Sequence, residues 1–197
     1  ESKDDNDHIG QLADIFAKYE VPAGMLAKLL GLKDFTTAEI IVDDSGSMTL
    51  VTDAEESGDG RQLSRWEEAK LRILQMMELM AYVSGPKVVI RFLNRPTGLE
   101  FQRGEAVLRY SLGDGVPNGG EAAAREISNI LRNRSAPERN PFTFISCTNN
   151  DSDTEWMKQC EEVAPYCSEF DDYKDESREI IRDQGVAFPY SFGLYLV

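Results

Sequence analysis

The most chemically specific stretch of the sequence is a row of oxygen-bearing side chains that directly follows an apolar run. Residues 40–42 are Ile-Ile-Val, and after them Asp43, Ser45 and Ser47 stand at every second position. Mg²⁺ prefers compact octahedral coordination by oxygen and keeps part of its water, so one carboxylate with two neutral hydroxyls suits it. A cation held in this way stays electrophilic enough to accept an acidic group from outside. The segment therefore predicts a divalent-cation site, for Mg²⁺ in the first place and for Mn²⁺ or Ca²⁺ as alternatives.

The same residue types could instead cap a helix, because Asp and Ser side chains accept hydrogen bonds from the first amides of helices. The next clear helical pattern begins only near Arg65, too far along the chain for such a cap. We expect the intervening acidic segment, 49–64, to be a solvated loop that overhangs the cation site. Its acidic residues, which could recruit a cation or a basic partner, are Asp53, Glu55, Glu56 and Asp59.

The elements that must position this site follow from the spacing of apolar residues. Strand patterns occupy 37–43, 87–94, 99–111, 142–147 and 164–172, and helical patterns occupy 65–84, 121–132, 153–163 and 174–185. Strands that alternate with helices indicate a mostly parallel sheet with helices on both faces. We therefore predict a three-layer α/β/α domain with a Rossmann-like central sheet. The strands 37–43, 87–93 and 142–147 should be central and buried, and 99–111 should be hairpin-like.

The N-terminal part of the chain has a different pattern. Residues 1–8 are polar, 9–19 carry apolar residues at helical spacing, and a second helical pattern over 23–31 follows Pro22. This predicts a helical hairpin that leads into the first strand and packs on the domain. We accordingly divide the chain into a tail with hairpin, 1–35, and an α/β domain, 36–197.

Three loops should meet at one edge of the sheet, because ligands of such folds bind beyond the carboxyl ends of the strands. These loops are 43–48, 114–121 and 148–153.

The segment Ile-Ile-Val-Asp-Asp-Ser-Gly-Ser-Met, residues 40–48, resembles the metal-ion-dependent adhesion site of the von Willebrand factor A domain family. The family pattern is Asp-x-Ser-x-Ser, then a threonine in a second loop and an aspartate in a third. The resemblance covers about 36–170 and implies a mostly parallel sheet flanked by helices. It also implies a protein ligand that presents an acidic group to a bound divalent cation, and no catalysis.

The chain departs from the family pattern at two positions. Glu121 follows Gly119-Gly120 where the family has threonine, and Thr148-Asn149-Asn150 stands where the family has Thr-Asp-Gly. The site residues that the resemblance implies are Asp43, Ser45, Ser47, Glu121 and Asn149, with Asp151 and Asp153 able to act through water. Glu121 either takes the place of the external acidic ligand and closes the site, or the site is degenerate and the fold is a scaffold within a larger intracellular protein.

Composition narrows the choice of partner. The formal net charge is −14, which argues against a nucleic-acid backbone or an anionic membrane surface as the main partner. No apolar run approaches the roughly 18 residues of a membrane span. The three cysteines, Cys147, Cys160 and Cys167, form no metal-type pair, and we expect them to be small buried side chains in a reducing, intracellular compartment.

An enzymatic alternative starts from the same aspartates, since a strand that ends in Asp-Asp could belong to a Mg²⁺-dependent phosphotransferase. The haloacid-dehalogenase pattern needs an aspartate two residues after the nucleophile, where Ser45 stands, and receiver domains need a lysine that does not follow Cys147 closely. No Walker loop or Gly-x-Ser-x-Gly elbow is present, and the single histidine, His8, lies in the polar tail. The sequence therefore favours a non-enzymatic protein-interaction domain.

Overall fold

The structure is a computed structural model of the 197-residue chain, and it describes residues 13–56, 61–81, 85–95, 105–148, 150–171, 173–188 and 190. Predictions that concern residues 1–12, Asp59, 96–104, Asn149 and 191–197 fall outside these ranges.

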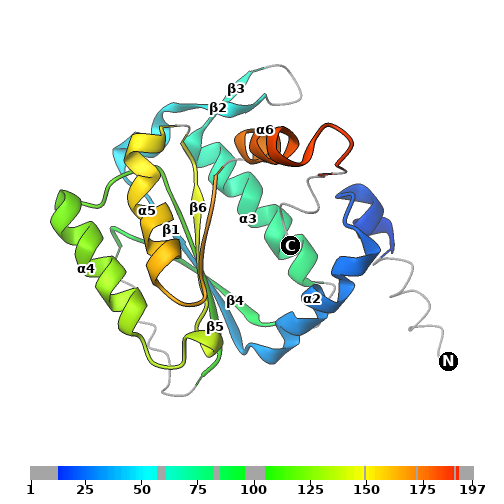
Figure 1. The fold of residues 1–197 in the computed structure, drawn as a ribbon, viewed down its shortest axis with the longest axis horizontal. Coiled ribbons are helices and arrows are strands. Elements are labelled where there is room, and N and C mark those ends of the chain that lie inside the picture. Colours follow the sequence, from blue (N-terminus) through cyan, green and yellow to red (C-terminus); the bar gives the residue numbers. More distant parts are fainter. Residues whose placement is uncertain are drawn as a thin grey trace.

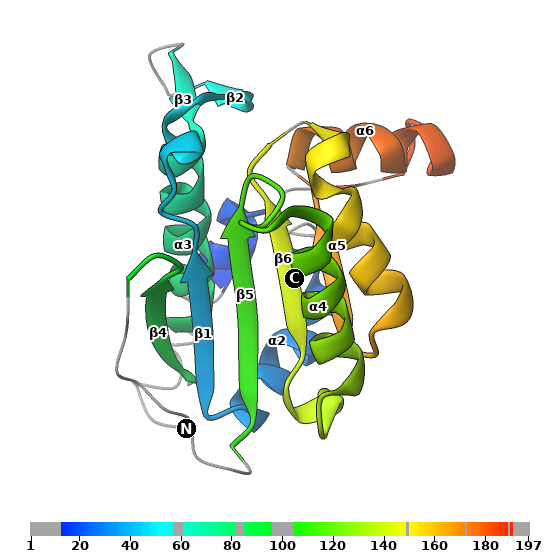
Figure 2. The same ribbon diagram turned by 90° about the vertical axis from the view of Figure 1, so that its left-hand side faces the viewer.

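A five-stranded parallel sheet forms the centre of the molecule (Figures 1 and 2). Its strands lie in the order β4-β1-β5-β6-β7, and every neighbouring pair is parallel. Their bounds are β1 Thr37–Val42, β4 Lys87–Phe92, β5 Val107–Gly113, β6 Phe142–Ser146 and β7 Cys167–Phe170. The predicted three-layer α/β fold with a mostly parallel sheet is thereby confirmed.

Helices cover both faces of this sheet, and each face buries its own apolar cluster. Helix α3, Arg65–Ala81, packs through Ala69 and Ile73 against Ile40 and Val42 of β1. Helices α4, Gly120–Asn133, and α5, Asp151–Val163, cover the opposite face (Figure 1). Their cluster consists of Leu131, Phe144, Met157, Cys160, Ala164 and Cys167. The last helix is α6, Tyr173–Gln184. All three cysteines are free and buried, as the sequence predicts.

The N-terminal elements pack on the end of α3. A helix over 13–18 is followed by the 3₁₀ turn η1, Ala23–Met25, the helix α2, Leu26–Gly31, and the 3₁₀ turn η2, Leu32–Asp34. Ile15, Tyr19 and Leu29 form a buried cluster with Leu79 of α3. Lys18 adds an ion pair to Glu78, with 2.7 Å between nitrogen and oxygen. The described residues of this N-terminal segment therefore pack on the end of α3.

The acidic segment between the first strand and α3 is folded, which corrects the prediction of a loop over 49–64. A 3₁₀ turn, η3 Gly46–Thr49, leads into an antiparallel pair, β2 Val51–Glu56 and β3 Gln62–Ser64. Figure 2 shows this hairpin projecting beyond the carboxyl ends of β1 and β5. Thr52 and Leu63 are buried, so the base of the hairpin packs on the domain.

Two further strand predictions are wrong in their placing. The strand predicted at 99–111 as hairpin-like begins at Val107 and runs parallel to β1, with Thr37 opposite Val107. The strand predicted as central at 87–93 is β4, which within the described sheet has β1 as its one neighbour and is half exposed. Alternation of apolar residues shows which faces of a strand are buried, but a parallel partner is chosen by tertiary packing.

Candidate functional site

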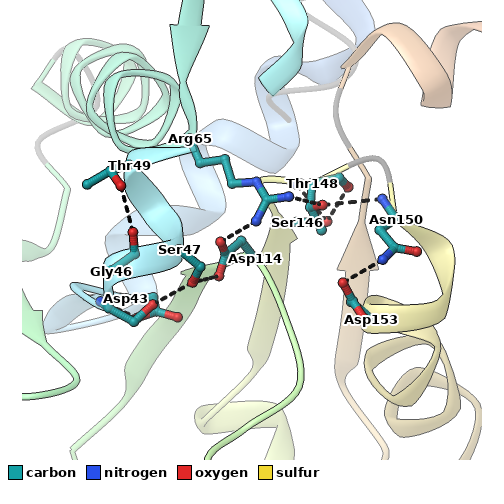
Figure 3. Close-up of polar contacts among 11 residues, drawn as sticks. Asp43, Gly46, Ser47, Thr49, Arg65, Asp114, Ser146, Thr148, Asn150 and Asp153 are labelled. Carbon is teal, nitrogen blue, oxygen red and sulfur yellow. Dashed lines mark hydrogen bonds and ion pairs between the residues drawn. The ribbon is translucent and has the colours of Figure 1, made fainter. Parts of the chain in front are cut away.

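The carboxyl ends of β1, β5 and β6 bring three short loops together. The parallel ladder extends one residue past each strand, since the Asp43 amide donates to the carbonyl of Leu112 at 2.8 Å and the Cys147 amide donates to that of Gly113 at 2.9 Å. Asp43 therefore leaves β1 beside Gly113, and Asp114 and Thr148 follow on the next two strands (Figure 3). This edge of the sheet, here termed the crevice, is where the chain order reverses, because β4 lies on one side of β1 and β5 on the other.

Hydrogen bonds link four residues with oxygen-bearing side chains at this edge. From Ser45 to Asp114 the links run between side-chain oxygens, and Asp43 joins through the Ser45 backbone amide. One carboxylate oxygen of Asp43 accepts the Ser45 amide at 2.8 Å. The hydroxyl of Ser45 lies 2.9 Å from that of Ser47, and Ser47 donates to Oδ1 of Asp114 at 3.0 Å. Met48 holds the loop after β1 in place, because it is 1% exposed and packs in the apolar cluster with Val42, Ala69 and Ile73. The sequence-predicted residues Asp43, Ser45 and Ser47 are thus brought together.

The spacing of these oxygens fits a small hard cation. In octahedral coordination with Mg–O bonds of about 2.1 Å, adjacent ligand oxygens lie about 3 Å apart. The two oxygen–oxygen distances along Ser45, Ser47 and Asp114 are 2.9 and 3.0 Å. The donors are two carboxylates and two hydroxyls, which is the oxygen-only chemistry that Mg²⁺ accepts. No cluster of three or more His, Cys, Asp or Glu side chains suited to a metal occurs in the described ranges, so this set relies on its hydroxyls.

Arg65 inserts a positive charge into the same crevice (Figure 3). Its guanidinium donates to Oδ2 of Asp114 at 2.5 Å and to the hydroxyl of Thr148 at 3.0 Å. The side chains of Arg65 and Asp114 are 17% and 3% exposed, so the ion pair is largely shielded from water. Asp114 consequently contacts both Ser47 and Arg65 and joins the two halves of the site.

The remaining predicted site residues lie apart from this group in the described contacts. Glu121 is on the first turn of α4 with 88% of its side chain exposed, and it pairs with Arg125 at 3.4 Å. Asn149 lies outside the described residues. Asp151 and Asp153 are in the first turn of α5, where Asp151 lies 3.6 Å from the Lys158 ammonium.

The loop before α5 is organised as a helix cap. Asn150 accepts the Ser152 amide as the N-cap residue, and its amide group donates to Asp153 at 2.6 Å. Before α4, the predicted second loop turns through Gly119 and Gly120, whose φ values of 115° and 62° are readily adopted by glycine alone. Both loops reach the carboxyl edge as expected, but Glu121, Asp151 and Asp153 lie in the first turns of the helices that follow. Carboxylates are favoured there by the helix dipole.

Asp44, the neighbour of Asp43, points away from the site. It accepts the amide and the side-chain nitrogen of Asn94 at 2.9 and 3.0 Å and pairs with Arg95 at 3.2 Å. The amide of Asn94 is the main reason why the pKa of Asp44 lies below its usual value. Asp44 therefore fixes the loop after β4.

Sequence reasoning missed the roles of Asp114, Arg65 and Thr148. The signal for Asp114 was available, because Gly113-Asp114 closes an apolar strand in the same way as Val42-Asp43 does. Asp114 lies within the second predicted loop, at the expected edge of the sheet. The analogy with the family threonine, however, assigns the ligand role in that loop to Glu121. No local signal places Arg65, since its partners are on two other strands.

Comparison with known proteins assigns the chain to no family, because no family model, curated protein or solved structure matches it. In the part of the chain that the structure describes, no helix has the length and apolar composition needed to cross a membrane.

Proposed function

We propose that the chain is a protein-interaction domain that binds an acidic group of its partner through a divalent cation at the carboxyl edge of the sheet. The observation that carries this proposal is the set of side-chain oxygens of Ser45, Ser47 and Asp114, whose successive distances of 2.9 and 3.0 Å are close to an octahedral edge. The Asp43 carboxylate lies beside them, bound to the Ser45 amide. These four residues would hold Mg²⁺, which would supply the positive charge that accepts the acidic ligand. We also propose that the chain is related to the von Willebrand factor A domain family.

The charge of the chain explains why a metal would matter to such a partner. At a net charge of −14, an acidic ligand is repelled at long range unless a local cation attracts it. Binding should therefore depend on the metal and weaken without it. The three buried free thiols are compatible with the reducing intracellular setting that we propose for the domain.

Binding rather than catalysis is favoured by the surroundings of Asp43. Its carboxylate is engaged by the Ser45 amide, and the position two residues later carries a hydroxyl rather than a second acid. A phosphotransferase would show Asp43-dependent turnover of p-nitrophenyl phosphate with Mg²⁺. We expect none above a blank.

The test is calorimetric titration of the chain with MgCl₂, MnCl₂ and CaCl₂, repeated for the double variant Ser45→Ala, Ser47→Ala. We expect the double variant to lose metal binding, because two of the four donors disappear. Thr49→Ala is the matched control: its hydroxyl is in the same turn but donates to the Gly46 carbonyl at 2.7 Å rather than to the oxygen chain. Acetate and a glutamate-containing peptide then test whether the bound metal accepts a carboxylate.

A wild-type chain that takes up none of the three metals at millimolar concentration would contradict the proposal and favour a scaffold role.

A further inference from the structure

The start of α3 is built so that Arg65 is held rigidly over the crevice. Ser64 and Glu67 form a reciprocal capping box: the Ser64 amide donates to the Glu67 carboxylate at 2.9 Å, and the Glu67 amide donates to the Ser64 hydroxyl at 3.2 Å. The amide of Arg65 donates to the Leu50 carbonyl at 2.9 Å, which ties this turn to the base of the hairpin. The guanidinium therefore projects from a preorganised helix start.

The partner of that guanidinium is the carboxylate that the proposed metal would need. Asp114 contributes Oδ1 to the oxygen chain and Oδ2 to Arg65, and it is nearly inaccessible to water. A buried carboxylate stabilises one neighbouring cation strongly, but two cations on it repel each other across a few ångströms of low dielectric. A divalent ion and the Arg65 guanidinium therefore weaken each other's electrostatic interaction with Asp114.

We propose that Arg65 is an internal counter-cation of the site, which competes with the divalent cation for Asp114 and weakens metal binding until an acidic ligand arrives. This inference rests on the proposed function, whose metal site it regulates. A carboxylate bound to the metal adds a negative charge to the crevice and relieves the repulsion between the metal and Arg65. Metal and acidic ligand should therefore bind cooperatively, each raising the affinity of the other by the same factor.

The experiment compares Mg²⁺ and Mn²⁺ affinities, by calorimetry, of the wild-type chain and Arg65→Gln. Since a hydrogen bond to a charged partner is worth about 1.5–3 kcal/mol, removing the competitor should tighten metal binding about tenfold or more. The matched control is Lys70→Gln, which removes an equal charge from an exposed position on the same helix. We expect the control to change the affinity less than about twofold, because exposed charges are screened.

A second measurement separates competition from a general change of the fold. Without metal, Arg65→Gln should lower the melting temperature, because Asp114 loses its counter-charge. Saturating Mg²⁺ should then close the gap to wild type, since the ion replaces the guanidinium. Arg65→Lys keeps the positive charge but cannot donate to Asp114 and Thr148 in the way that a guanidinium does. Its metal affinity should therefore lie between those of wild type and Arg65→Gln.

The outcomes distinguish the two proposals. Tighter metal binding by Arg65→Gln than by wild type supports the competition. A wild-type chain that binds metal as tightly as Arg65→Gln overturns the role of Arg65 and leaves the metal site standing. If no variant binds any metal although the melting curves show that all of them are folded, the proposed metal site is wrong and this inference is wrong with it.

Discussion

Asp114 divides its two carboxylate oxygens between Ser47 and Arg65, so a single side chain links the oxygen chain to the internal cation. Only 3% of this side chain is exposed, and a carboxylate so placed is stable because both oxygens have partners. We therefore expect Asp114 to have two energetic roles, one in the proposed metal binding and one in the stability of the metal-free fold.

Asp114→Asn should consequently weaken both properties. Mg²⁺ affinity should fall about tenfold or more, and the free energy of unfolding without metal should fall by about 1–3 kcal/mol, because Arg65 keeps a buried charge without its counter-ion. Calorimetry and urea unfolding measure the two effects. Glu121→Gln is the control, since it removes an exposed carboxylate from the same edge of the sheet. An equal loss of metal affinity in the control would restore Glu121 as a ligand.

At this scale the sequence predicted the residues of one loop better than the contacts between loops. Asp43, Ser45 and Ser47 could be assigned because their spacing is local and the hydrogen bonds among them follow from it. Asp114 and Arg65 could not be assigned, because their pairing depends on which strand lies beside β1 and on where α3 begins. Family analogy pointed to Glu121, which the structure places on a solvated helical turn beside Arg125.

At the scale of elements, the start of α3 controls the geometry of the site through its capping box. Arg61 and both the amide and the hydroxyl of Ser64 donate to the Glu67 carboxylate, and Arg61 is the main reason why the pKa of Glu67 is lowered to about 2. The Glu67 carboxylate is therefore ionised at neutral pH, where it can accept these hydrogen bonds.

Ser64→Ala should destabilise the domain by about 1 kcal/mol, since an N-cap hydroxyl is lost from a helix that packs on the central strand. It should also reduce the order of the Arg65 side chain, so Mg²⁺ should bind somewhat more tightly than to wild type. Urea unfolding and calorimetry check the pair of effects. Ser152→Ala, whose hydroxyl donates to Asn150 at the start of α5, changes a helix end away from Arg65 and should leave the metal affinity unaltered.

Elements were predicted well where their signals are local. The helices over 65–81, 120–133 and 151–163 agree with predicted ranges to within a few residues, because apolar spacing and end signals are contained in the segment itself. The β2–β3 hairpin was missed because its acidic composition outweighed a short alternating pattern. The parallel pairing of β5 with β1 was missed because nothing within 99–111 encodes the partner strand.

At the scale of the whole molecule, a group of carboxyls lies away from the proposed cation site, around the edge strand β7. Burial is the main cause that raises the pKa of Glu169 to about 8, and the negative charge of Asp171 adds to it. Lys158 opposes the shift, while Glu161 and Glu176 reinforce it. Among the described residues, one buried oxygen of Glu169 has no hydrogen-bond partner, so a proton on this group is favoured by its surroundings.

Stability should therefore depend on pH in a defined direction. The folded pKa lies above the unfolded value of about 4.3, so the stabilisation from the protonated group is complete below that value and is lost as the pH rises through 8. Urea unfolding should show that the free energy of unfolding of wild type is lower at pH 8.5 than at pH 5.5. The decrease should be smaller for Glu169→Gln, because glutamine stays neutral. Glu162→Gln, on the exposed side of α5, should behave as wild type. Equal losses in all three proteins would show that Glu169 is ionised throughout.

The hydrogen bonds at the crevice also have a consequence for the order in which the chain folds. Ser47, Arg65, Asp114 and Thr148 come from four separate stretches of sequence, and their contacts close loops of 67, 49 and 83 residues. Long loops are costly to close before the strands between them have paired. The crevice therefore exists only in a chain whose central sheet is completely assembled. A partner that recognises it discriminates against every incompletely folded copy of the domain, without any contact to the core itself.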